Sequence, residues 1–399
     1  MLGPLALLLA LGGLSYIVAA RVVLVPGPLV ALALGAVVGV GSPLGANLLW
    51  PGEQVLPPEP LLSFRAMGAV LLMWGAGVEL EVAALRPGRQ LFRAMAVGLG
   101  GAACSALLAL GLLRLGLLGA FAPREQLGLA LLSAASAIPV LLAVVRSLGR
   151  LHHPLTRTAL VAALLVDLVL IALIPLINAE HAEVSPLAHL AKTLVYLGAM
   201  IALAEGPARE HLRRWGRAAR RHVSRQSALI ALGFGITLGV VSLAGQLGVE
   251  LLPAALGWGI GSRPLFFPDA AEEHNPFFEA FFPFEASYFA LAGAMLDLRL
   301  VSWEGALFAG AAIVGKVAGG LLGGRDGLRV GTLLVPRGAV DLVLAVNLLV
   351  NGVLSPAGYA LAVTMIAITT LGGALLARLA FEGALSKPSA ELERLRVTR

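Results

Sequence analysis

The sequence predicts an all-α polytopic membrane protein. Of its 399 residues, 58% are hydrophobic and only 13% are charged, whereas a soluble domain of this size would carry far more charge on its surface. Apolar runs of roughly 20 residues recur along the chain, and each is long enough as a helix to cross a hydrocarbon core of about 30 Å. The short alternating segments typical of a transmembrane β-barrel do not occur.

Pro, Gly and charged residues divide the apolar runs into about thirteen candidate transmembrane helices. We expect them at 2–20, 28–41, 61–80, 91–113, 125–147, 156–178, 186–205, 226–243, 246–262, 276–296, 301–323, 329–352 and 357–379. The first run has no basic residues before its apolar part, and Arg21 follows it. We therefore expect a retained helix rather than a cleaved signal peptide.

The basic residues indicate the orientation. Loops after odd-numbered helices, together with the C-terminal tail, hold 22 of the 29 lysines and arginines, whereas loops after even-numbered helices hold 5. Because lysine and arginine are enriched on the cytoplasmic side of membrane proteins, we expect the N-terminus outside and the C-terminus in the cytoplasm. An error of one helix in the middle of the count would remove this bias, so the bias supports thirteen helices.

The most basic stretch, 206–226, follows the seventh candidate helix. We expect it to be a cytoplasmic loop that sets the topology and touches anionic lipid headgroups. A nucleotide or regulator site is the alternative, and no other feature of the sequence supports it. We do not expect nucleic acid as a partner. We expect 381–399 to be a short cytoplasmic tail without a regulatory domain.

Two candidate helices contain helix breakers near their middles. The helix at 125–147 has a run of small residues and Pro139 at its centre, and the helix at 329–352 contains Pro336, Arg337 and Gly338. Proline removes an amide donor and kinks or interrupts a helix. Interrupted backbone survives in a bilayer only where it lines a protein-enclosed or watery cavity. Ordinary proline kinks in packed helices are the alternative interpretation.

The two breaks lie seven helices apart, so the two broken helices run in opposite directions through the membrane. This is the pattern of inverted repeats, in which paired interrupted segments cross near the membrane midplane and point to the binding site of a transporter. We expect one integral membrane unit over 1–399, with repeat one at about 1–180 and repeat two at about 226–380. The helix at 186–205 links the two repeats.

Few ionisable residues lie at the centres of the predicted helices. They are Asp167, Glu285, Lys316, Arg337 and Asp341. Each charge at the membrane centre costs roughly 2.5–3.5 kcal/mol on insertion scales, so such residues persist when they pair with one another or serve ion or proton movement. Lysine, unlike arginine, can lose its proton when it is buried. A pair of Lys316 and a carboxylate could therefore exchange a proton as an ion arrives.

Asp167 suits a site at which two ligands compete. Its carboxylate could bind either a proton or a small hard cation such as Na⁺, which prefers oxygen ligands. The hydroxyls of Ser133 and Ser136, with carbonyls freed at the break, could complete the cation's shell. Mutual exclusion at one site, combined with alternating access, gives antiport. A structural salt bridge from Asp167 to Lys316 or Arg337 is the alternative, and purely structural roles also remain open for Glu285 and Asp341.

Seven stretches of the sequence match a known family of membrane proteins in the family's order. They are AARVVLVPGPLVALALGAVVGV, GAVLLMWGAGVELEVAAL, LLSAASAIPVLLAVVRSLG, VAALLVDLVL, YFALAGAMLDL, GKVAGGLLGG and VPRGAVDLVLAV. Together they resemble the monovalent cation:proton antiporter-2 family, which includes bacterial Na⁺/H⁺ and K⁺/H⁺ exchangers. The resemblance covers essentially the whole chain, and each motif is individually loose.

The resemblance implies a sodium/proton antiporter fold of thirteen helices, a homodimer formed through a scaffold domain, elevator-like movement of a core domain, and location in the bacterial inner membrane. Asp167 falls on the family's ion-binding aspartate and Lys316 on its buried helix lysine. Ser136 falls on the serine of the unwound helix, and Arg337 on the arginine of the Pro-Arg-Gly motif. The cation ligand is then Asp167.

Several positions depart from the family's pattern. Val166 stands where the family has a second Asp or an Asn, and Ala135 replaces the threonine of a Thr-Ser pair. Ala339 replaces a glutamate, with an acid two residues later, and Glu285 is an added midplane acid. Because Val166 stands in place of that second acid or Asn, Lys316 lacks its usual carboxylate partner. We therefore expect Lys316 to pair with Asp167, Glu285 or Asp341.

The sequence thus predicts a secondary transporter that exchanges protons for Na⁺ or K⁺, with no cofactor besides the transported ions. A sodium-coupled carrier of an organic anion on a related inverted-repeat fold is the alternative, because helix ends at the breaks and Arg337 could hold a carboxylate. An enzyme is not expected, because the sequence has no His-Glu-x-x-His, no Gly-x-Ser-x-Gly and no Asp-rich metal box.

Overall fold

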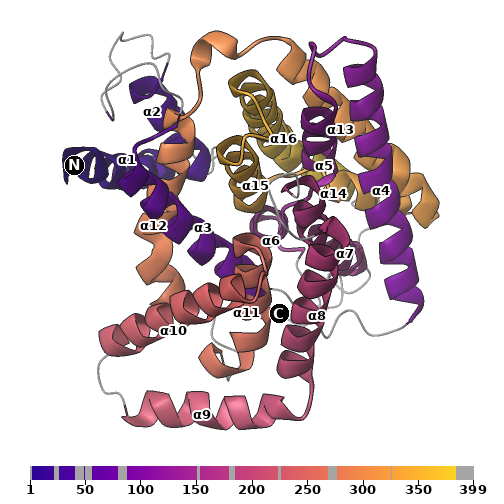
Figure 1. Cartoon of the computed structure of the whole chain (residues 1–399). Coiled ribbons are helices and arrows are strands. Elements are labelled where there is room, and N and C mark those ends of the chain that lie inside the picture. The colour runs from indigo at the N-terminus through magenta and orange to yellow at the C-terminus, as the bar shows by residue number, and fades with distance from the viewer. Residues whose placement is uncertain are drawn as a thin grey trace, which may run out of the picture.

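The computed structural model describes residues 2–21, 27–40, 49, 56–79, 88–150, 153–178, 185–222, 226–267, 276–324 and 326–382. Within these ranges every regular element is a helix, which confirms the predicted all-α class (Figure 1). Each of the thirteen expected spans coincides with one helix or with a pair of helices that meet at a break. The expected tail at 381–399 lies outside the described residues from position 383 onward.

One group of helices contains the two interrupted ones and the helices packed around them. Its members are α4 (Arg89–Arg114), α5 (Pro123–Ala134), α6 (Ile138–Ser147), α7 (Pro154–Asn178), α13 (Glu304–Gly320), the 3₁₀ turn η4 (Leu321–Gly323), α14 (Gly327–Leu333), α15 (Ala339–Val350) and α16 (Pro356–Glu382).

Small residues let α4 and α13 pack closely. A Cβ atom added at Gly319 would overlap the main chain of Gly101, and one at Gly315 would overlap Ser105. The Ser105 hydroxyl donates a 3.0 Å hydrogen bond to the Ala312 carbonyl of α13. Small residues and hydroxyls at such contacts are typical of helix packing inside membranes, where the hydrophobic effect does not drive helices together.

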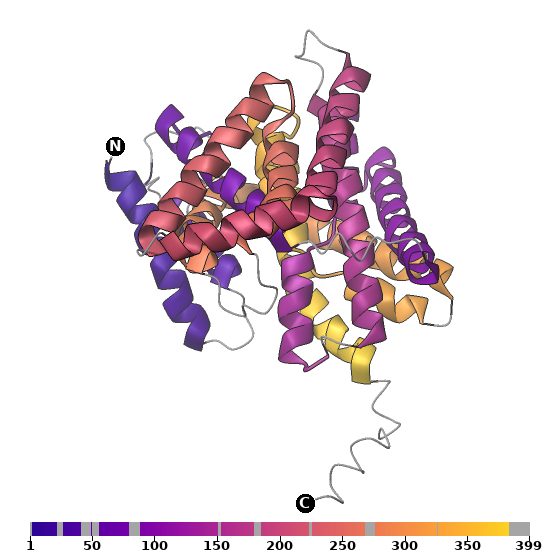
Figure 2. The same ribbon diagram turned by 90° about the horizontal axis from the view of Figure 1, so that it is seen from below.

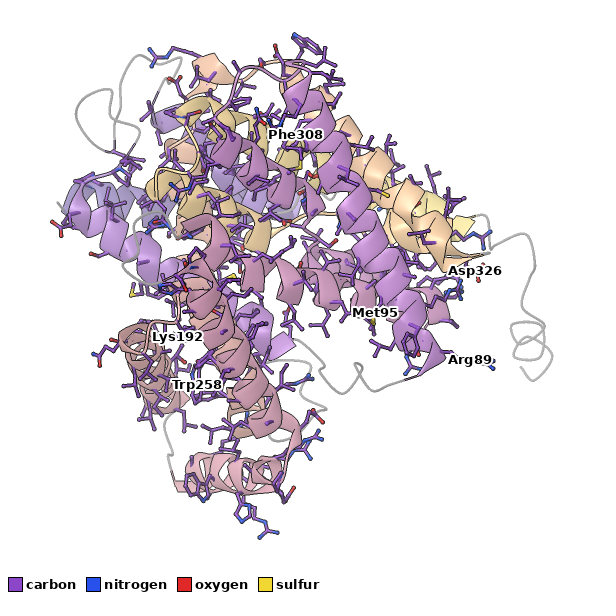
Figure 3. All side chains as sticks on the ribbon, turned by 45° about the vertical axis from the view of Figure 1, so that its right-hand side comes forward. Arg89, Met95, Lys192, Trp258, Phe308 and Asp326 are labelled. Atoms are coloured by element: carbon purple, nitrogen blue, oxygen red, sulfur yellow. The ribbon has the colours of Figure 1, made fainter. Side chains whose placement is uncertain are left out.

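The two helices are antiparallel. Figure 3 shows Phe308, in the second turn of α13, in the upper part of the molecule, whereas Arg89 at the start of α4 and Asp326 before α14 lie lower, on the right-hand side. At that end Arg93 forms a 3.3 Å ion pair with Asp326 and donates from Nε to the Gly323 carbonyl. The segment between α13 and α14 is thereby fastened to α4.

The second group consists of α1 (Leu2–Arg21), α2 (Gly27–Val38), α3 (Glu59–Glu79), α10 (Gln226–Gln246), α11 (Leu251–Phe266) and α12 (Pro276–Ala294). The 3₁₀ turn η3 (Leu298–Leu300) follows α12 and contacts α16 of the first group. Glycines again set the close contacts, because Cβ atoms at Gly77 of α3 and Gly259 of α11 would each overlap the facing main chain. Trp74 of α3 donates a 3.1 Å hydrogen bond to the Ser262 hydroxyl of α11. These contacts position α3 firmly against α11.

Two helices join the groups. The helix α8 (Pro186–Glu205) follows α7 and packs against α11, and its Tyr196 hydroxyl donates a 3.0 Å hydrogen bond to the Ala254 carbonyl. After Gly206 and Pro207 the chain turns into α9 (Ala208–His222), which lies crosswise to α8 (Figure 1). Seen from below in Figure 2, α9 runs across the face nearest the viewer.

Membrane spanning is supported by length and composition. Among the described residues, seven helices are long and apolar enough to cross a membrane, namely α3, α4, α7, α8, α10, α13 with η4, and α16. Shorter apolar helices include α1, α2 and α15. The count of thirteen transmembrane helices stays a prediction.

Candidate functional site

The two predicted helix breaks meet inside the first group of helices. The first is the non-helical segment 135–137 between α5 and α6, and the second is 334–338 between α14 and α15. The Ala137 amide donates a 3.3 Å hydrogen bond to the Pro336 carbonyl. The Ser136 hydroxyl lies 3.4 Å from the Leu334 carbonyl oxygen, which it can reach as a donor. The predicted pair of interrupted helices is confirmed, and the two interruptions cross.

Local sequence explains where each helix stops. Pro139 lies in the first turn of α6, where the amide that proline lacks would have no helical partner. Gly338 lies directly before α15, and a Cβ atom there would come within 2.7 Å of Val140 and 3.0 Å of Ala137. Only glycine therefore lets the second break approach α6 this closely. Thr370 of α16 stabilises the second break, because its hydroxyl donates a 2.9 Å hydrogen bond to the Arg337 carbonyl.

Two cationic side chains occupy the end of the half-helix α5. Arg337 donates to the carbonyls of Leu132 and Ser133, and Lys316 of α13 donates to the carbonyl of Ala134. The last carbonyls of a helix have no partner within it and carry a partial negative charge. Both cations are buried, so each replaces at this helix end the hydration that water would otherwise supply.

Arg337 also faces an acid. Its guanidinium lies 3.8 Å from the carboxylate of Asp341, which is in the first turn of α15. The other oxygen of Asp341 accepts a 3.0 Å hydrogen bond from the Gly338 amide and so caps the start of α15. Both side chains are fully buried. Asp341 therefore neutralises Arg337 and satisfies a free helix amide, which is a structural use of its charge.

Asp167 lies midway along α7 and is buried, with 5% of its surface exposed. The Ser136 amide at the first break donates to its carboxylate, and Lys316, Arg337 and Asp341 lie within electrostatic range. Its oxygen Oδ1 has no hydrogen-bond partner among the described residues. The crossing thus holds a buried carboxylate that has one oxygen free to take up a proton or a cation.

Lys316 is placed differently from the expectation. Its ammonium donates to the Ala134 carbonyl and, at 2.7 Å, to the Ser136 hydroxyl oxygen. Among the residues that the structure describes, no carboxylate lies within the 4.0 Å of an ion pair with it, so the expected direct pairs with Asp167, Glu285 and Asp341 are not formed. The carbonyl at the end of α5 attracts the ammonium instead, because that oxygen carries the partial negative charge of the helix end.

Two other candidate residues have separate surroundings. The Ser133 hydroxyl donates a 2.7 Å hydrogen bond back to the Ala130 carbonyl within α5. Glu285 lies on α12 in the second group of helices, where its electrostatic neighbours are Glu79 of α3 and Tyr16 of α1. The structure therefore gathers Asp167, Ser136, Lys316, Arg337 and Asp341 at the crossing and leaves Glu285 outside it.

Two of the positions that depart from the family pattern are neighbours in space. Ala135 and Val166 belong to one buried apolar cluster beside the first break, whose other members are Ala134, Leu170, Ala102, Ala106 and Leu131. An acid at position 166 would face this apolar wall. Nothing in the sequence indicated this contact, the hydrogen bond of Thr370, or the use of the α5 carbonyls as acceptors for Arg337 and Lys316, because these contacts depend on how the helices pack.

The family model described as sodium/hydrogen exchanger, transmembrane, matches residues 6–382. A search of curated protein sequences gave no match. Among solved structures, the sodium proton antiporter MjNhaP1 from Methanocaldococcus jannaschii at pH 8 is 16% identical, with a TM-score of 0.66 over 95% of this chain and 97% of that one. An electron-microscopy structure of the same antiporter is 20% identical, with a TM-score of 0.64 over 97% and 99% of the two chains. These likenesses support the fold.

Proposed function

The chain belongs to the sodium/hydrogen exchanger family, and we propose that Asp167 is the site at which it exchanges a proton for a monovalent cation. The protein is a multi-pass membrane transporter that couples monovalent cation movement to protons, and it is not an enzyme. The observation that carries the proposal is the free Oδ1 oxygen of Asp167 at the crossing of two interrupted helices. Interrupted helices at corresponding places in two halves of a transporter are where substrate sites are built.

Competition at one carboxylate gives the exchange. The Ser136 amide holds one side of the Asp167 carboxylate, so Oδ1 can carry a proton or contact a cation but not both at once. The Ser136 hydroxyl and the non-helical carbonyls of the first break are nearby hard oxygen ligands, which suit Na⁺ or K⁺. Ser133 would contribute through its hydroxyl oxygen, which keeps acceptor capacity while donating to Ala130.

The surrounding charges have supporting roles. Lys316 and Arg337 compensate the carbonyl end of α5, and Asp341 compensates Arg337. The crossing can therefore bind a cation at Asp167 without leaving a helix end uncompensated. Glu285 would act only indirectly, because it lies in the other group of helices.

For the membrane setting, we propose the bacterial inner membrane, with the N-terminus outside and the C-terminus in the cytoplasm. The excess of arginine and lysine in the loops after odd-numbered helices supports this orientation. In this arrangement α9 lies on the cytoplasmic side. We further propose a homodimer formed through the second group of helices, on the basis of the family resemblance.

The experiment is cation-driven proton flux in proteoliposomes with a pH-sensitive dye inside. Addition of Li⁺, Na⁺, K⁺ or Rb⁺ alone is expected to change the internal pH with the intact chain. Asp167→Asn, which removes the ionisable oxygen at nearly the same volume, is expected to abolish the change. Full activity of the asparagine variant would overturn the site assignment.

Two controls separate the site from other effects. Glu59→Gln removes an exposed acid at the start of α3 and is expected to transport normally. The alternative carrier of an organic anion requires an organic substrate for any sodium-dependent flux. A pH change with inorganic salts alone therefore excludes that alternative, whereas strict dependence on an added organic anion would replace the proposal.

A further inference from the structure

The helix α9 is strongly basic and lies crosswise at the end of a membrane-length helix. Its sequence AREHLRRWGRAARRH contains six arginines and one glutamate, a net charge of +5 with neutral histidines. Only Gly206 and Pro207 separate it from the end of α8. Because α8 runs lengthwise in Figure 1 and α9 runs crosswise from its lower end, α9 is placed where a helix would lie along a membrane surface.

The helix is fixed in this place by contacts with α11. Arg220 donates a 2.7 Å hydrogen bond to the carbonyl of Phe266, the last residue of α11. Gly216 is buried, and a Cβ atom there would overlap the main-chain oxygen of Leu265. Arg209 forms a 3.2 Å ion pair with Glu205 of α8. One face of α9 therefore packs against α11. This contact fixes the rotation of the helix, so its other faces point in set directions.

An apolar stripe runs along one edge of α9. Ala208, Leu212, Trp215 and Ala219 are spaced four, three and four residues apart, so they follow one side of the helix. Trp215 is 69% exposed and therefore has little protein around it. Tryptophan favours the boundary between headgroups and acyl chains, where its ring is in an apolar region and its N–H reaches water.

The exposed face on the other side of α9 from this stripe carries unbalanced positive charge. The side chains of Arg214 and Arg217 are 70% and 46% exposed, and both pair with the single carboxylate of Glu210, at 3.7 and 3.1 Å. One acid between two arginines leaves one positive charge uncompensated on this face. A basic face opposite an apolar edge with an exposed tryptophan is the pattern of a helix that lies in the interface of a membrane containing anionic lipid.

We propose that α9 is an interfacial helix that binds the phosphate headgroups of anionic lipids, with Trp215 inserted at the headgroup boundary and Arg214 and Arg217 on the phosphates. With the orientation proposed above, this is the cytoplasmic leaflet. Since α9 is fastened to α11, lipid binding would hold the second group of helices at a set depth in the membrane. The inference does not depend on Asp167 as the ion site.

The test uses the full chain in detergent, titrated with phosphatidylglycerol or with phosphatidylcholine while the thermal unfolding midpoint is followed. Phosphatidylglycerol is expected to raise the midpoint, and phosphatidylcholine is not. Arg214→Gln with Arg217→Gln is expected to raise the half-saturating concentration of phosphatidylglycerol about 30-fold, because each near-surface arginine contributes about a factor of five. Glu210→Gln is expected to lower that concentration.

The matched control is Arg89→Gln with Arg114→Gln, which removes the same charge from the two exposed ends of α4. This control is expected to bind phosphatidylglycerol as the intact chain does. Equal losses in the two double variants would overturn the proposal, because the effect would then reflect only total charge. A response to soluble glycerophosphate or to duplex DNA that matches the response to the lipid would also overturn it.

Insertion of Trp215 has its own readout. In vesicles with bromine-labelled acyl chains, the quenched fraction of tryptophan fluorescence is compared between the intact chain and Trp215→Phe. The difference is expected to be larger in vesicles that contain phosphatidylglycerol than in phosphatidylcholine alone. No difference in either vesicle would show that Trp215 stays in water and would contradict the insertion.

Discussion

The ammonium of Lys316 lies 2.7 Å from the hydroxyl oxygen of Ser136, and its other hydrogen bond goes to the carbonyl of Ala134. Both acceptors are neutral groups. Lys316 therefore donates its hydrogen bonds to the end of α5, with Asp167 and Asp341 within electrostatic range but not in direct contact. Among the described residues, the Oδ1 atoms of Asp341 and Asp167 both lack a hydrogen bond, but that of Asp341 lies 3.8 Å from the Arg337 guanidinium. Asp167 is therefore the carboxylate of the crossing with an oxygen that no cation faces at ion-pair distance.

This arrangement predicts electroneutral exchange. With one carboxylate available, each half-cycle carries either one proton or one monovalent cation, so no net charge moves. Proton flux driven by a cation gradient in proteoliposomes is expected to be the same with the membrane potential free and with it clamped at zero by valinomycin and potassium. A rate that rises when the potential is clamped would indicate net charge movement and contradict the prediction.

The apolar neighbours of the site predict the effect of a second acid. Val166 packs with Ala134 and Ala135, next to the carbonyl that Lys316 holds. Val166→Asp places a carboxylate near that ammonium and is expected to make the flux depend on the potential. Val166→Thr, which keeps the volume without adding charge, is the control and is expected to stay electroneutral. Potential-independent flux in the aspartate variant would show that position 166 does not set the coupling.

Arg337 is predicted to be required for folding stability. Arg337→Gln removes the donors to Leu132 and Ser133 and leaves Asp341 buried without its cation. Breaking one partner of a buried pair costs about 3–5 kcal/mol. The thermal unfolding midpoint in detergent is expected to fall clearly, whereas exposed Arg114→Gln leaves it unchanged. Adding Asp341→Asn to the Arg337 variant is expected to recover part of the loss, and no recovery would contradict the pairing.

Glu125 is predicted to stabilise the junction of α5 and α16. Its buried carboxylate accepts hydrogen bonds from the Ser355 amide at 2.7 Å and from the Ser355 hydroxyl at 2.6 Å, directly before α16. Hydrogen bonds to charged groups contribute about 1.5–3 kcal/mol. Glu125→Gln is expected to lower the free energy of unfolding by an amount in this range. Glu59→Gln is the exposed control, and equal stability of the two variants would refute the role.

His153 is predicted to make stability depend on pH. It lies just before α7, and burial, then Arg150 and Arg329, lower its pKa, with Asp326 opposing. Its Nδ1 accepts a 3.2 Å hydrogen bond from the Leu155 amide, which a second ring proton would prevent. Because the pKa is lowered in the folded state, the unfolded chain takes up the proton first as the pH falls.

The contribution of His153 is therefore fully present above about pH 6.5, the ordinary value for histidine, and is lost as the pH falls through the folded-state pKa. Unfolding midpoints measured from pH 8 down to pH 5 are expected to fall less steeply for His153→Gln than for the intact chain. His211→Gln, on the exposed face of α9, is the control and is expected to follow the intact chain. Parallel curves for all three proteins would contradict the prediction.

Much of the architecture could be predicted from the sequence because membrane-spanning segments are recognisable from their apolar composition. Apolar length gave the helices, and Pro139 and Pro336 with Gly338 marked both breaks, since proline and glycine act on the backbone wherever they stand. Asp167 was recognisable because a lone acid within an apolar helix is costly and needs a use.

The partners of those residues could not be predicted. The expected ion pair of Lys316 was inferred from charge alone, whereas the structure offers it the carbonyl of Ala134, a main-chain atom that every residue has. Glu285 had the same sequence signal as Asp167, yet the packing of α12 keeps it among α1, α2 and α3.

By itself, the sequence determined which segments are helical, where two of them are interrupted, and which charges must be buried, because these depend on local covalent chemistry and on the cost of transfer from water. Only the tertiary structure decided which of those charges meet. The crossing brings residues nearly 200 positions apart, such as Ser136 and Leu334, within 3.4 Å, and it lets Ala135 and Val166 form one apolar wall. Such contacts depend on how helices pack, and helix packing is decided by the shapes of both surfaces at once.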